Sequence, residues 1–376
     1  MKKTKNVLLY IMLFCVLHII LVWLIFGCSG KVDLKKQPII HELEFGGVYV
    51  TKTIEEFNEL GFEYGDSVTV KFSNGYILED IPYYNGYYTN NGEPLLVAYP
   101  GYDFIKVAIN NGDDLFFVAN LSEEDTATIT INEKGKYLPI QNVRNLQYLD
   151  ERERYDSDEM FANFRASNVT GLKANTLYRS ASPCDNQHNR ATFVDALIRE
   201  AGVSFILDLA DTDAKVSGYI NNPSFNCPYF LTLYNSDAVY PIGLNMNYGS
   251  QDFKEKVAGG LKEMIKHDGP YLVHCTEGKD RTGFVCMLLE ALVGASYDEI
   301  VKDYMITYYN YYRIGEDSDK YSVIIDSLLN PMIKSMVNDN SVDYKTCDLS
   351  VYAEAFLTEA GMSELQISTL KDKLMN

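Results

Sequence analysis

The chain has 376 residues and a formal net charge of −19, because 52 Asp and Glu outnumber 33 Lys and Arg. Hydrophobic residues make up 47% and charged residues 23%, which is ordinary for a globular protein with a packed core. The length predicts about two domains, with three as the upper alternative. The acidic balance argues against nucleic-acid binding as the main function, because phosphate backbones attract basic surfaces.

The first 28 residues have the layout of a targeting segment. A basic start at residues 2–5 precedes an apolar run at 7–26, and Gly27 and Cys28 follow. This is the order of a secretory signal, and about 20 apolar residues are also enough to span a bilayer. The end of the run resembles a bacterial lipoprotein signal with Cys28 as the lipidated residue, and an uncleaved signal anchor is the alternative. Both place the rest of the chain on the extracytoplasmic face of the cell membrane, where we expect it.

The spacing of the seven cysteines matches no disulfide or metal-binding pattern. Their number is odd and no Cys-x-x-Cys spacing occurs, which argues against a disulfide scaffold and against a structural zinc site. We therefore expect neither a metal nor a cofactor.

Residues 37–148 are predicted to form a β-rich domain, a small barrel or sandwich. Residues 67–72 and 126–131 alternate polar and apolar side chains, the period of a half-buried strand. The turn signals Asn74-Gly75 and Asn111-Gly112 separate such runs.

No cluster of chemically reactive side chains stands out in this β-rich segment, so a packing or spacer role is the simplest interpretation. A ligand- or glycan-binding module is the alternative. It rests only on tyrosines near turns that we expect to be exposed, namely Tyr83, Tyr84, Tyr87 and Tyr88.

Residues 155–376 alternate strand and helix signals, and we place the domain boundary at the charged stretch 150–158. Such alternation predicts an α/β fold with a mostly parallel sheet flanked by helices. The predicted strands are 204–209 and 271–273, and two helices are predicted at 253–265 and 282–292. A third helix begins at a Ser296–Glu299 capping box. Two more helices lie within 351–375, where Gly361 separates them and Ser363 caps the second.

The chemistry lies in the segment His274–Gly283, between an apolar strand and an apolar helix. A loop at a helix N-terminus turns backbone N–H groups toward one point and so binds a tetrahedral anion. Cys275 opens the loop and Arg281 closes it, and the helix dipole favours the thiolate of Cys275 over the thiol. The planar fork of Arg281 can bind two phosphate oxygens, and Gly278 permits a backbone conformation that a side chain would obstruct.

Two other interpretations of this segment fail. A nucleotide-binding loop requires a Gly at position 273 and a Ser or Thr at position 280, where Val273 and Asp280 stand. A metal site would need a second Cys or His cluster, and His274 has none beside it in the sequence. His274 is better explained as a buried residue that holds the loop by hydrogen bonds.

The pattern His-Cys-x5-Arg-Thr-Gly resembles the signature of cysteine-dependent tyrosine and dual-specificity phosphatases, and its Gly-Lys-Asp-Arg-Thr-Gly version resembles the bacterial branch of atypical tyrosine phosphatases. Residues 163–165 (Asn-Phe-Arg), 177–181 (Leu-Tyr-Arg-Ser-Ala) and 205–209 are similar to further segments of that branch, although Ala210 stands where an Arg is common. The resemblance covers about residues 160–376.

The resemblance implies a mechanism. The Cys275 thiolate attacks phosphorus and forms a cysteinyl-phosphate, which water then hydrolyses without metal or cofactor. The hydroxyl of Thr282 stabilises the thiolate as it leaves. The phosphoryl oxygens are bound by the phosphate loop, that is by Thr276, Glu277, Gly278, Lys279, Asp280 and Arg281.

The general acid has three candidates. The Trp-Pro-Asp context of many tyrosine phosphatases is absent, since the only Trp of the chain is Trp23. Asp280 in the loop, and Asp208 or Asp211 at a strand end, remain as proton donors. Asp280 is also explained as a helix N-cap.

Two basic residues bear on the substrate. Arg179 is either a second anion contact or a buried ion-pair partner. Lys279 is either a solvated lysine or, as in related enzymes that accept phosphoinositides or phosphoserine and phosphothreonine, a second charge beside the phosphate.

Three functions remain open at this point. The first is a protein-tyrosine or dual-specificity phosphatase at the bacterial cell surface, with a phosphorylated protein as partner. The second is a phosphatase for phosphoinositides or inositol phosphates. The third is a catalytically silent, phosphate-binding surface protein. In all three, we expect the N-terminal segment to attach the protein to the membrane, and we expect no nucleic acid as a partner.

Overall fold

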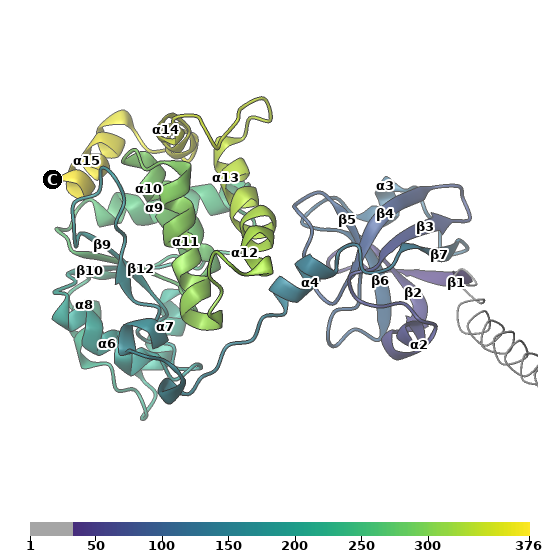
Figure 1. Cartoon of the computed structure of the whole chain (residues 1–376), viewed down its shortest axis with the longest axis horizontal. Coiled ribbons are helices and arrows are strands. Elements are labelled where there is room, and N and C mark those ends of the chain that lie inside the picture. The colour runs from purple at the N-terminus through teal and green to yellow at the C-terminus, as the bar shows by residue number, and fades with distance from the viewer. Residues whose placement is uncertain (1–32) are drawn as a thin grey trace, which may run out of the picture. The chain divides into compact units, whose positions relative to one another are not determined.

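The computed structural model describes residues 33–376, so the predicted targeting segment and its Cys28 lie outside the described residues. The chain divides into two compact units between Gln141 and Asn142 (Figure 1). The charged stretch 150–158 therefore belongs to the second unit, and the division comes earlier than the boundary that the sequence suggests. Within residues 33–376, no helix is both long and apolar enough to cross a membrane.

The first unit is a closed seven-stranded barrel (Figure 1). Its strands follow one another in the order β1-β2-β6-β5-β4-β3-β7, and β7 pairs back to β1. All neighbours are antiparallel except β4 and β5, which are parallel. The strands are β1 (Asp33–His41), β2 (Val48–Thr53), β3 (Ser67–Phe72), β4 (Ile77–Tyr84), β5 (Pro94–Val97), β6 (Phe104–Ile109) and β7 (Thr126–Glu133).

The barrel interior follows from the alternation seen in the sequence. In β3, Val68, Val70 and Phe72 are fully buried, because every second side chain of a strand points to the same face. The unit is not entirely β, since it also contains the short helices α2 (Ile54–Glu59) and α3 (Leu115–Val118).

Two of the four tyrosines that suggest a binding module are not at the surface. Tyr83 and Tyr84 are buried at 0% and 1% exposure, whereas we expected them at the surface. They are the last two residues of β4, and both rings are packed in the interior before the chain turns. Tyr87 and Tyr88 are half-buried and pack against the Tyr84 cluster.

The second unit is built on a five-stranded sheet in the order β11-β10-β12-β9-β8. The strands are β8 (Arg165–Ala166), β9 (Leu177–Ser180), β10 (Phe205–Asp208), β11 (Val239–Pro241) and β12 (Tyr271–His274). Four of them run parallel and only the edge strand β8 is antiparallel to its neighbour, so the sheet is mixed. The α/β prediction is confirmed, with this antiparallel edge as the difference.

Helices cover both faces of this sheet (Figure 1). The helices from residue 138 onward, of which α4 crosses the division between the two units, are α4 (Leu138–Arg144), η1 (Arg152–Arg154), α5 (Asp158–Phe161), α6 (Ala191–Glu200), α7 (Asp213–Ile220), α8 (Pro228–Tyr234), α9 (Gln251–Met264), α10 (Asp280–Leu292), α11 (Tyr297–Tyr312), α12 (Asp319–Ile324), η2 (Ile325–Leu329), α13 (Asn330–Val337), α14 (Leu349–Glu359) and α15 (Glu364–Met375). The Ser296 capping box expected from the sequence is present, and Ser363, expected as an N-cap, also forms a capping box with Gln366.

Successive residues of the central strands supply two different cores. Phe205, Leu207 and Val273 pack on the face covered by α9, α10 and α14. Ile206 and Leu272, one position along, pack on the opposite face against α6 and α8. The strands are buried on both sides, which explains their unbroken apolar sequence and rigidly fixes the strand ends that carry the site.

Candidate active site

The segment with the Cys-x5-Arg pattern joins the carboxyl end of β12 to the N-terminus of α10. In a parallel sheet, ligands bind outside the carboxyl ends of the strands, where loops and helix N-termini meet. Cys275 directly follows β12 and is 3% exposed. We refer to residues 275–281 as the phosphate loop.

The carbonyl groups of the phosphate loop are held from outside by other elements. The backbone N–H of Ser182 donates to the Thr276 oxygen at 3.1 Å. The Tyr311 hydroxyl donates to the Glu277 oxygen at 2.7 Å. Asn163 Nδ2 donates to the Gly278 oxygen at 3.2 Å.

These contacts set the direction of the loop's N–H groups. In a planar trans peptide, the N–H points opposite to the C=O of the same peptide unit. With the oxygens of residues 276–278 turned outward, the N–H groups of residues 277–279 turn to the inner side of the loop. Converging N–H groups at a helix N-terminus form an anion site, so the loop is built to bind a phosphoryl group.

Gly278 is required where it stands. Its φ of +68° lies in the left-handed region, and a Cβ there would come within 2.3 Å of the Ser180 oxygen. The tight approach of the loop to the end of β9 therefore depends on the missing side chain.

Arg281 is held at two points. Its Nη2 donates to Thr276 Oγ1 and its Nη1 to the Leu244 backbone oxygen, both at 3.3 Å. The guanidinium fork thus lies between the start of the phosphate loop and the segment after β11. A half-buried fork in this place can bind two oxygens of one phosphate.

His274 and Thr282 directly flank the phosphate loop in the sequence. The Thr282 hydroxyl oxygen is fully buried and has no hydrogen-bond partner among the described residues, which leaves it available for a donor role. Burial lowers the pKa of His274 to about 4, so its imidazole is neutral near pH 7. His274 Nδ1 lies 3.4 Å from the Cys275 oxygen and so supports the loop, as expected.

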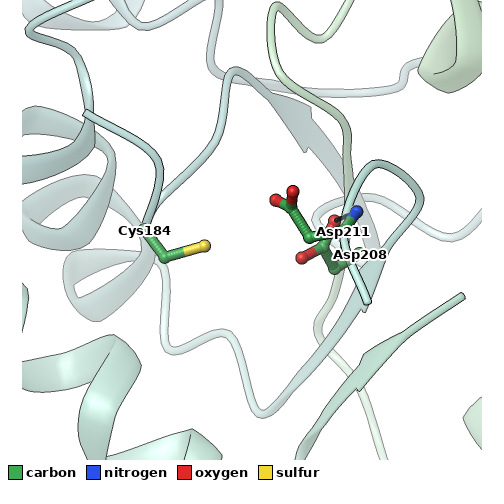
Figure 2. A group of neighbouring side chains, drawn as sticks. All are labelled: Cys184, Asp208 and Asp211. Carbon is green, nitrogen blue, oxygen red and sulfur yellow. Dashed lines mark hydrogen bonds between the residues drawn. The ribbon is translucent and has the colours of Figure 1, made fainter. Parts of the chain in front are cut away.

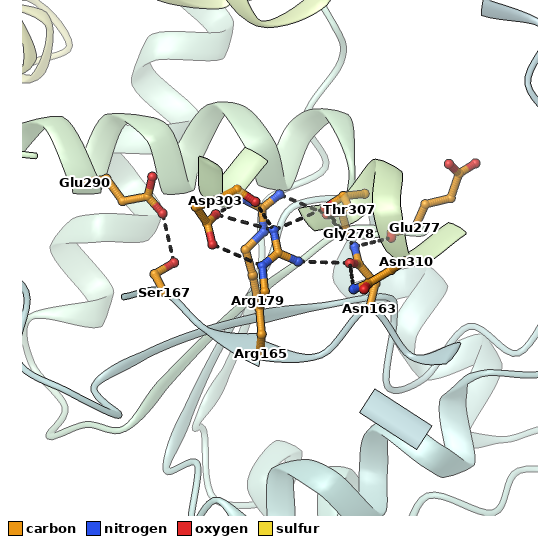
Figure 3. A network of polar contacts seen from close by, with 10 residues as sticks. All are labelled: Asn163, Arg165, Ser167, Arg179, Glu277, Gly278, Glu290, Asp303, Thr307 and Asn310. Atoms are coloured by element: carbon orange, nitrogen blue, oxygen red, sulfur yellow. Dashed lines mark hydrogen bonds and ion pairs between the residues drawn. The ribbon is translucent and has the colours of Figure 1, made fainter. Parts of the chain in front are cut away.

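Behind the loop lies a buried network of charges (Figure 3). Arg165 and Arg179 both contact the Asp303 carboxylate, at 3.0 and 2.7 Å, and Arg179 also donates to the Gly278 oxygen at 3.1 Å. Burial opposes ionisation of Asp303, but the two guanidinium groups lower the pKa of its carboxyl group to about 2. Burial raises the pKa of nearby Glu290, which accepts a hydrogen bond from the Ser167 hydroxyl at 2.9 Å.

Of the two roles expected for Arg179, the structure therefore shows the second, that of a buried ion-pair partner. It is 1% exposed and engaged with Asp303 and a loop carbonyl, so it positions the loop from behind instead of facing a second anion.

Lys279 is paired within the loop itself. Its Nζ lies 3.0 Å from Glu277 and 3.7 Å from Asp280. Burial works against ionisation of Glu277, but the Lys279 ammonium outweighs it and lowers the pKa of that carboxyl group. Lys279 is thus neither a solvated lysine nor an unpaired charge beside the phosphate. Asp280 is the first residue of α10, and its side chain is 28% exposed.

The strand-end carboxylates form an adjoining group with Cys184 (Figure 2). Asp208 is 0% exposed and Asp211 is 3% exposed. Burial raises the pKa of Asp208 to about 6 and also raises the pKa of Asp211. Asp208 Oδ1 lies 3.9 Å from His274 Nδ1, which places this group next to β12.

The sequence motifs did not reveal the part of α11 that holds the loop. Asp303, Thr307, Asn310 and Tyr311 contact either the loop or the residues that hold it. These side chains recur at three- to four-residue spacing, the one signal that could have placed them on a single helix face.

Residues 140–376 match the tyrosine phosphatase family. No curated protein matches the chain. Among solved structures, the chain is similar to the core catalytic domain of the PP-IP phosphatase SIW14 from S. cerevisiae in complex with citrate, at 19% identity and a TM-score of 0.26. That match covers 48% of this chain and 93% of the other. With more than half of its length matched and with the Cys275–Arg281 loop in place, the chain belongs to the tyrosine phosphatase family and is a phosphoric monoester hydrolase.

Proposed function

We propose that this phosphatase acts on phosphotyrosine, alone or with phosphoserine and phosphothreonine, in a protein substrate. The observation that carries the proposal is the charge state of the phosphate loop. Lys279 is paired with Glu277 and Asp280, and Arg179 is buried against Asp303. Arg281, bound only to a hydroxyl and a backbone oxygen, is the loop's cation that lacks a carboxylate partner among the described residues.

This charge arrangement suits one phosphate group. A ligand with several phosphates needs several accessible cations, because each added phosphate brings about two negative charges. Such a ligand would also be repelled by a chain of net charge −19. A phosphoinositide or inositol phosphate is therefore the second candidate, and it has less support.

The reaction proceeds through Cys275. Its thiolate attacks phosphorus, the ester oxygen leaves, and a cysteinyl-phosphate forms. The inward N–H groups of the loop and the Arg281 fork stabilise the phosphoryl oxygens as charge develops on them. Water hydrolyses the intermediate, and the Thr282 hydroxyl donates to the departing thiolate.

Asp280 is the proton donor that fits best. Its carboxyl group is part-exposed at the N-terminus of α10, on the loop itself, whereas Asp208 is fully covered. Proton donation matters most for poor leaving groups. Asp280→Asn should therefore slow hydrolysis of phenyl phosphate much more than that of 4-nitrophenyl phosphate, and an equal loss for both would remove Asp280 from this role.

The main test uses the full chain with a chelator and a reductant. We expect hydrolysis of 4-nitrophenyl phosphate that withstands the chelator and disappears in Cys275→Ser. A panel of phosphotyrosine, phosphoserine and phosphothreonine peptides and phosphoinositides then compares kcat/KM. The proposal expects a phosphotyrosine peptide to rank first, and a higher kcat/KM for phosphoinositides would overturn it.

We also propose that the chain is tethered at the extracytoplasmic face of a bacterial membrane. The support is the basic, apolar and Gly27-Cys28 order of the N-terminal segment. The wild type expressed in a bacterial host should partition with membranes and incorporate labelled palmitate. Labelling that persists in Cys28→Ser would contradict lipidation at this residue.

A further inference from the structure

Asp208, Asp211 and Cys184 come together from two loops that are separate in the sequence. Cys184 lies in the turn after β9, and the two aspartates lie at and just after the end of β10. One ligand atom from each, the thiol sulfur and a carboxylate oxygen of each aspartate, lie within 4.8 Å of one another. All three residues are buried, at 3% exposure or less. Figure 2 shows the Cys184 sulfur directed toward the two carboxyl groups.

The hydrogen bonds leave one oxygen of each carboxylate unused. Asp208 Oδ1 accepts from the backbone N–H groups of Ala210 and Asp211 at 2.9 and 3.2 Å. Asp211 Oδ1 accepts from the Tyr219 hydroxyl at 3.3 Å and lies 3.8 Å from Lys215 Nζ. The Oδ2 atoms of both aspartates are buried and have no hydrogen-bond partner among the described residues.

One hydrogen-bonded oxygen and one unbonded oxygen on each carboxylate is the arrangement found in metal-binding carboxylates. In metal sites, one oxygen binds the ion while outer hydrogen bonds hold the carboxylate in place. Two buried carboxyl groups side by side must in any case be neutralised, either by a proton that they share or by a cation.

A cavity of about 150 Å³ borders the group at Cys184. Cys184 forms part of its wall together with Tyr219, Asn222 and Cys227. Tyr219 is also the residue that orients Asp211, so the cavity and the carboxylates share a side chain.

We propose that Cys184, Asp208 and Asp211 form a binding site for a thiophilic divalent cation, with Zn²⁺ as the preferred ion. A thiolate with two carboxylates suits Zn²⁺, whereas Mg²⁺ and Ca²⁺ take oxygen ligands only. Three protein ligands leave the fourth position of a tetrahedral shell to water. Cys184 binds as the thiolate and releases its proton to solvent.

The bound ion would brace the phosphate loop. Ser182, two residues before Cys184, donates its backbone N–H to the Thr276 oxygen. An ion that joins Cys184 to the end of β10 fixes the turn that makes this contact. This role is independent of the substrate proposed above, and it revises the expectation from the sequence that no metal is bound.

The test uses the full chain in the Cys275→Ser background, because a catalytic thiolate could bind the same ions. Under a non-thiol reductant, Co²⁺ should produce thiolate-to-metal charge-transfer absorption, and Zn²⁺ should displace it. Cys184→Ser should abolish this absorption. Cys227→Ser is the matched control, since Cys227 lines the same cavity outside the group, and it should leave the absorption unchanged.

Two further measurements keep the test decisive. Zn²⁺ at about 100 times its Kd should raise Tm by roughly 5 °C or more, and Asp211→Asn should weaken binding at least on the order of tenfold. If Cys184→Ser does not fold, Asp211→Asn serves as the test variant. The Tm of Asp211→Asn in the presence of a chelator then shows whether this variant is folded.

The proposal is overturned if absorption persists in Cys184→Ser, or if neither Co²⁺ nor Zn²⁺ produces a signal or a Tm shift. In the second case the two carboxyl groups share a proton. If the signal appears only when Cys275 is present, the ion binds at the catalytic thiolate and the proposal also fails.

Discussion

Arg281 shows how much of this site depends on the shape of one side chain. Its two nitrogens contact a hydroxyl and a backbone oxygen on either side of the guanidinium. A planar fork in that place can bind two phosphate oxygens at once, whereas an ammonium group offers a single point of charge.

Arg281→Lys should therefore lower kcat/KM for 4-nitrophenyl phosphate on the order of 100-fold or more, as expected when a fixed donor to the transition state is lost. Arg199→Lys, an exposed change of the same type on α6, is the control and should leave kcat/KM unchanged. A loss below about tenfold in Arg281→Lys would mean that charge alone is sufficient.

Asp303 makes stability depend on pH. Its pKa is about 2 in the folded protein against an ordinary value of 3.8, so its ionised form is stabilised by folding. This contribution, about 2 kcal/mol, is fully present above pH 4 and is lost as the pH falls toward 2.

Asp303→Asn removes that contribution and leaves Arg165 and Arg179 without their carboxylate. We expect the variant to be about 3–5 kcal/mol less stable near neutral pH, because breaking a buried ion pair is costly. Urea unfolding at a series of pH values should show the gap to wild type narrowing below pH 4. A gap that stays constant down to the lowest pH at which both proteins fold would argue against the assigned pKa.

At the scale of elements, α11 acts as a support for the phosphate loop. It carries Asp303, which binds both buried arginines, and Tyr311, which donates to the Glu277 oxygen. These side chains lie on one face of the helix and follow its repeat. The loop is thus shaped by β9, by Asn163 in the segment between α5 and β8, and by α11 as much as by its own residues.

Tyr311→Phe removes one loop hydrogen bond and little volume. We expect kcat/KM to fall about fivefold, the effect of one ordinary hydrogen bond, with weaker binding of inorganic phosphate. Tyr309→Phe, on the same helix but 49% exposed, is the matched control. If Tyr311→Phe changed Tm but neither kcat/KM nor phosphate binding, the hydroxyl would stabilise the fold without positioning the loop.

At the scale of the whole molecule, the groups that hold the phosphate loop lie, within residues 33–376, between Asn163 and Tyr311 of the second unit. The barrel has a separate hydrophobic core of its own. Domains with their own cores can fold alone.

The fragment 138–376, which keeps α4 intact, should therefore retain the kcat of the full chain on 4-nitrophenyl phosphate. Cys275→Ser in the fragment is the background control. A fragment that unfolds cooperatively but has a much lower kcat would show that the barrel contributes to catalysis on small substrates.

The sequence by itself determined what is local. The Cys275–Arg281 spacing, the strand before it and the helix after it are encoded by neighbouring residues, as are the alternation in β3 and the caps of Ser296 and Ser363. It also identified Gly278 as a position without room for a side chain. Such features depend on the periodicity of apolar side chains along the sequence and on the chemistry of a few adjacent residues.

Only the tertiary structure decided which distant residues meet. Arg179 could have faced an anion, but β9 places it under the loop against Asp303, 124 residues away. Lys279 could have been solvated or could have supplied a second charge beside the phosphate, but the conformation of the loop pairs it with Glu277 and Asp280. Cys184 and the pair Asp208 and Asp211 have no metal-binding spacing, because their proximity arises from parallel strands whose carboxyl ends meet at one edge of the sheet. Contacts of this kind depend on burial and strand order, which no local pattern encodes.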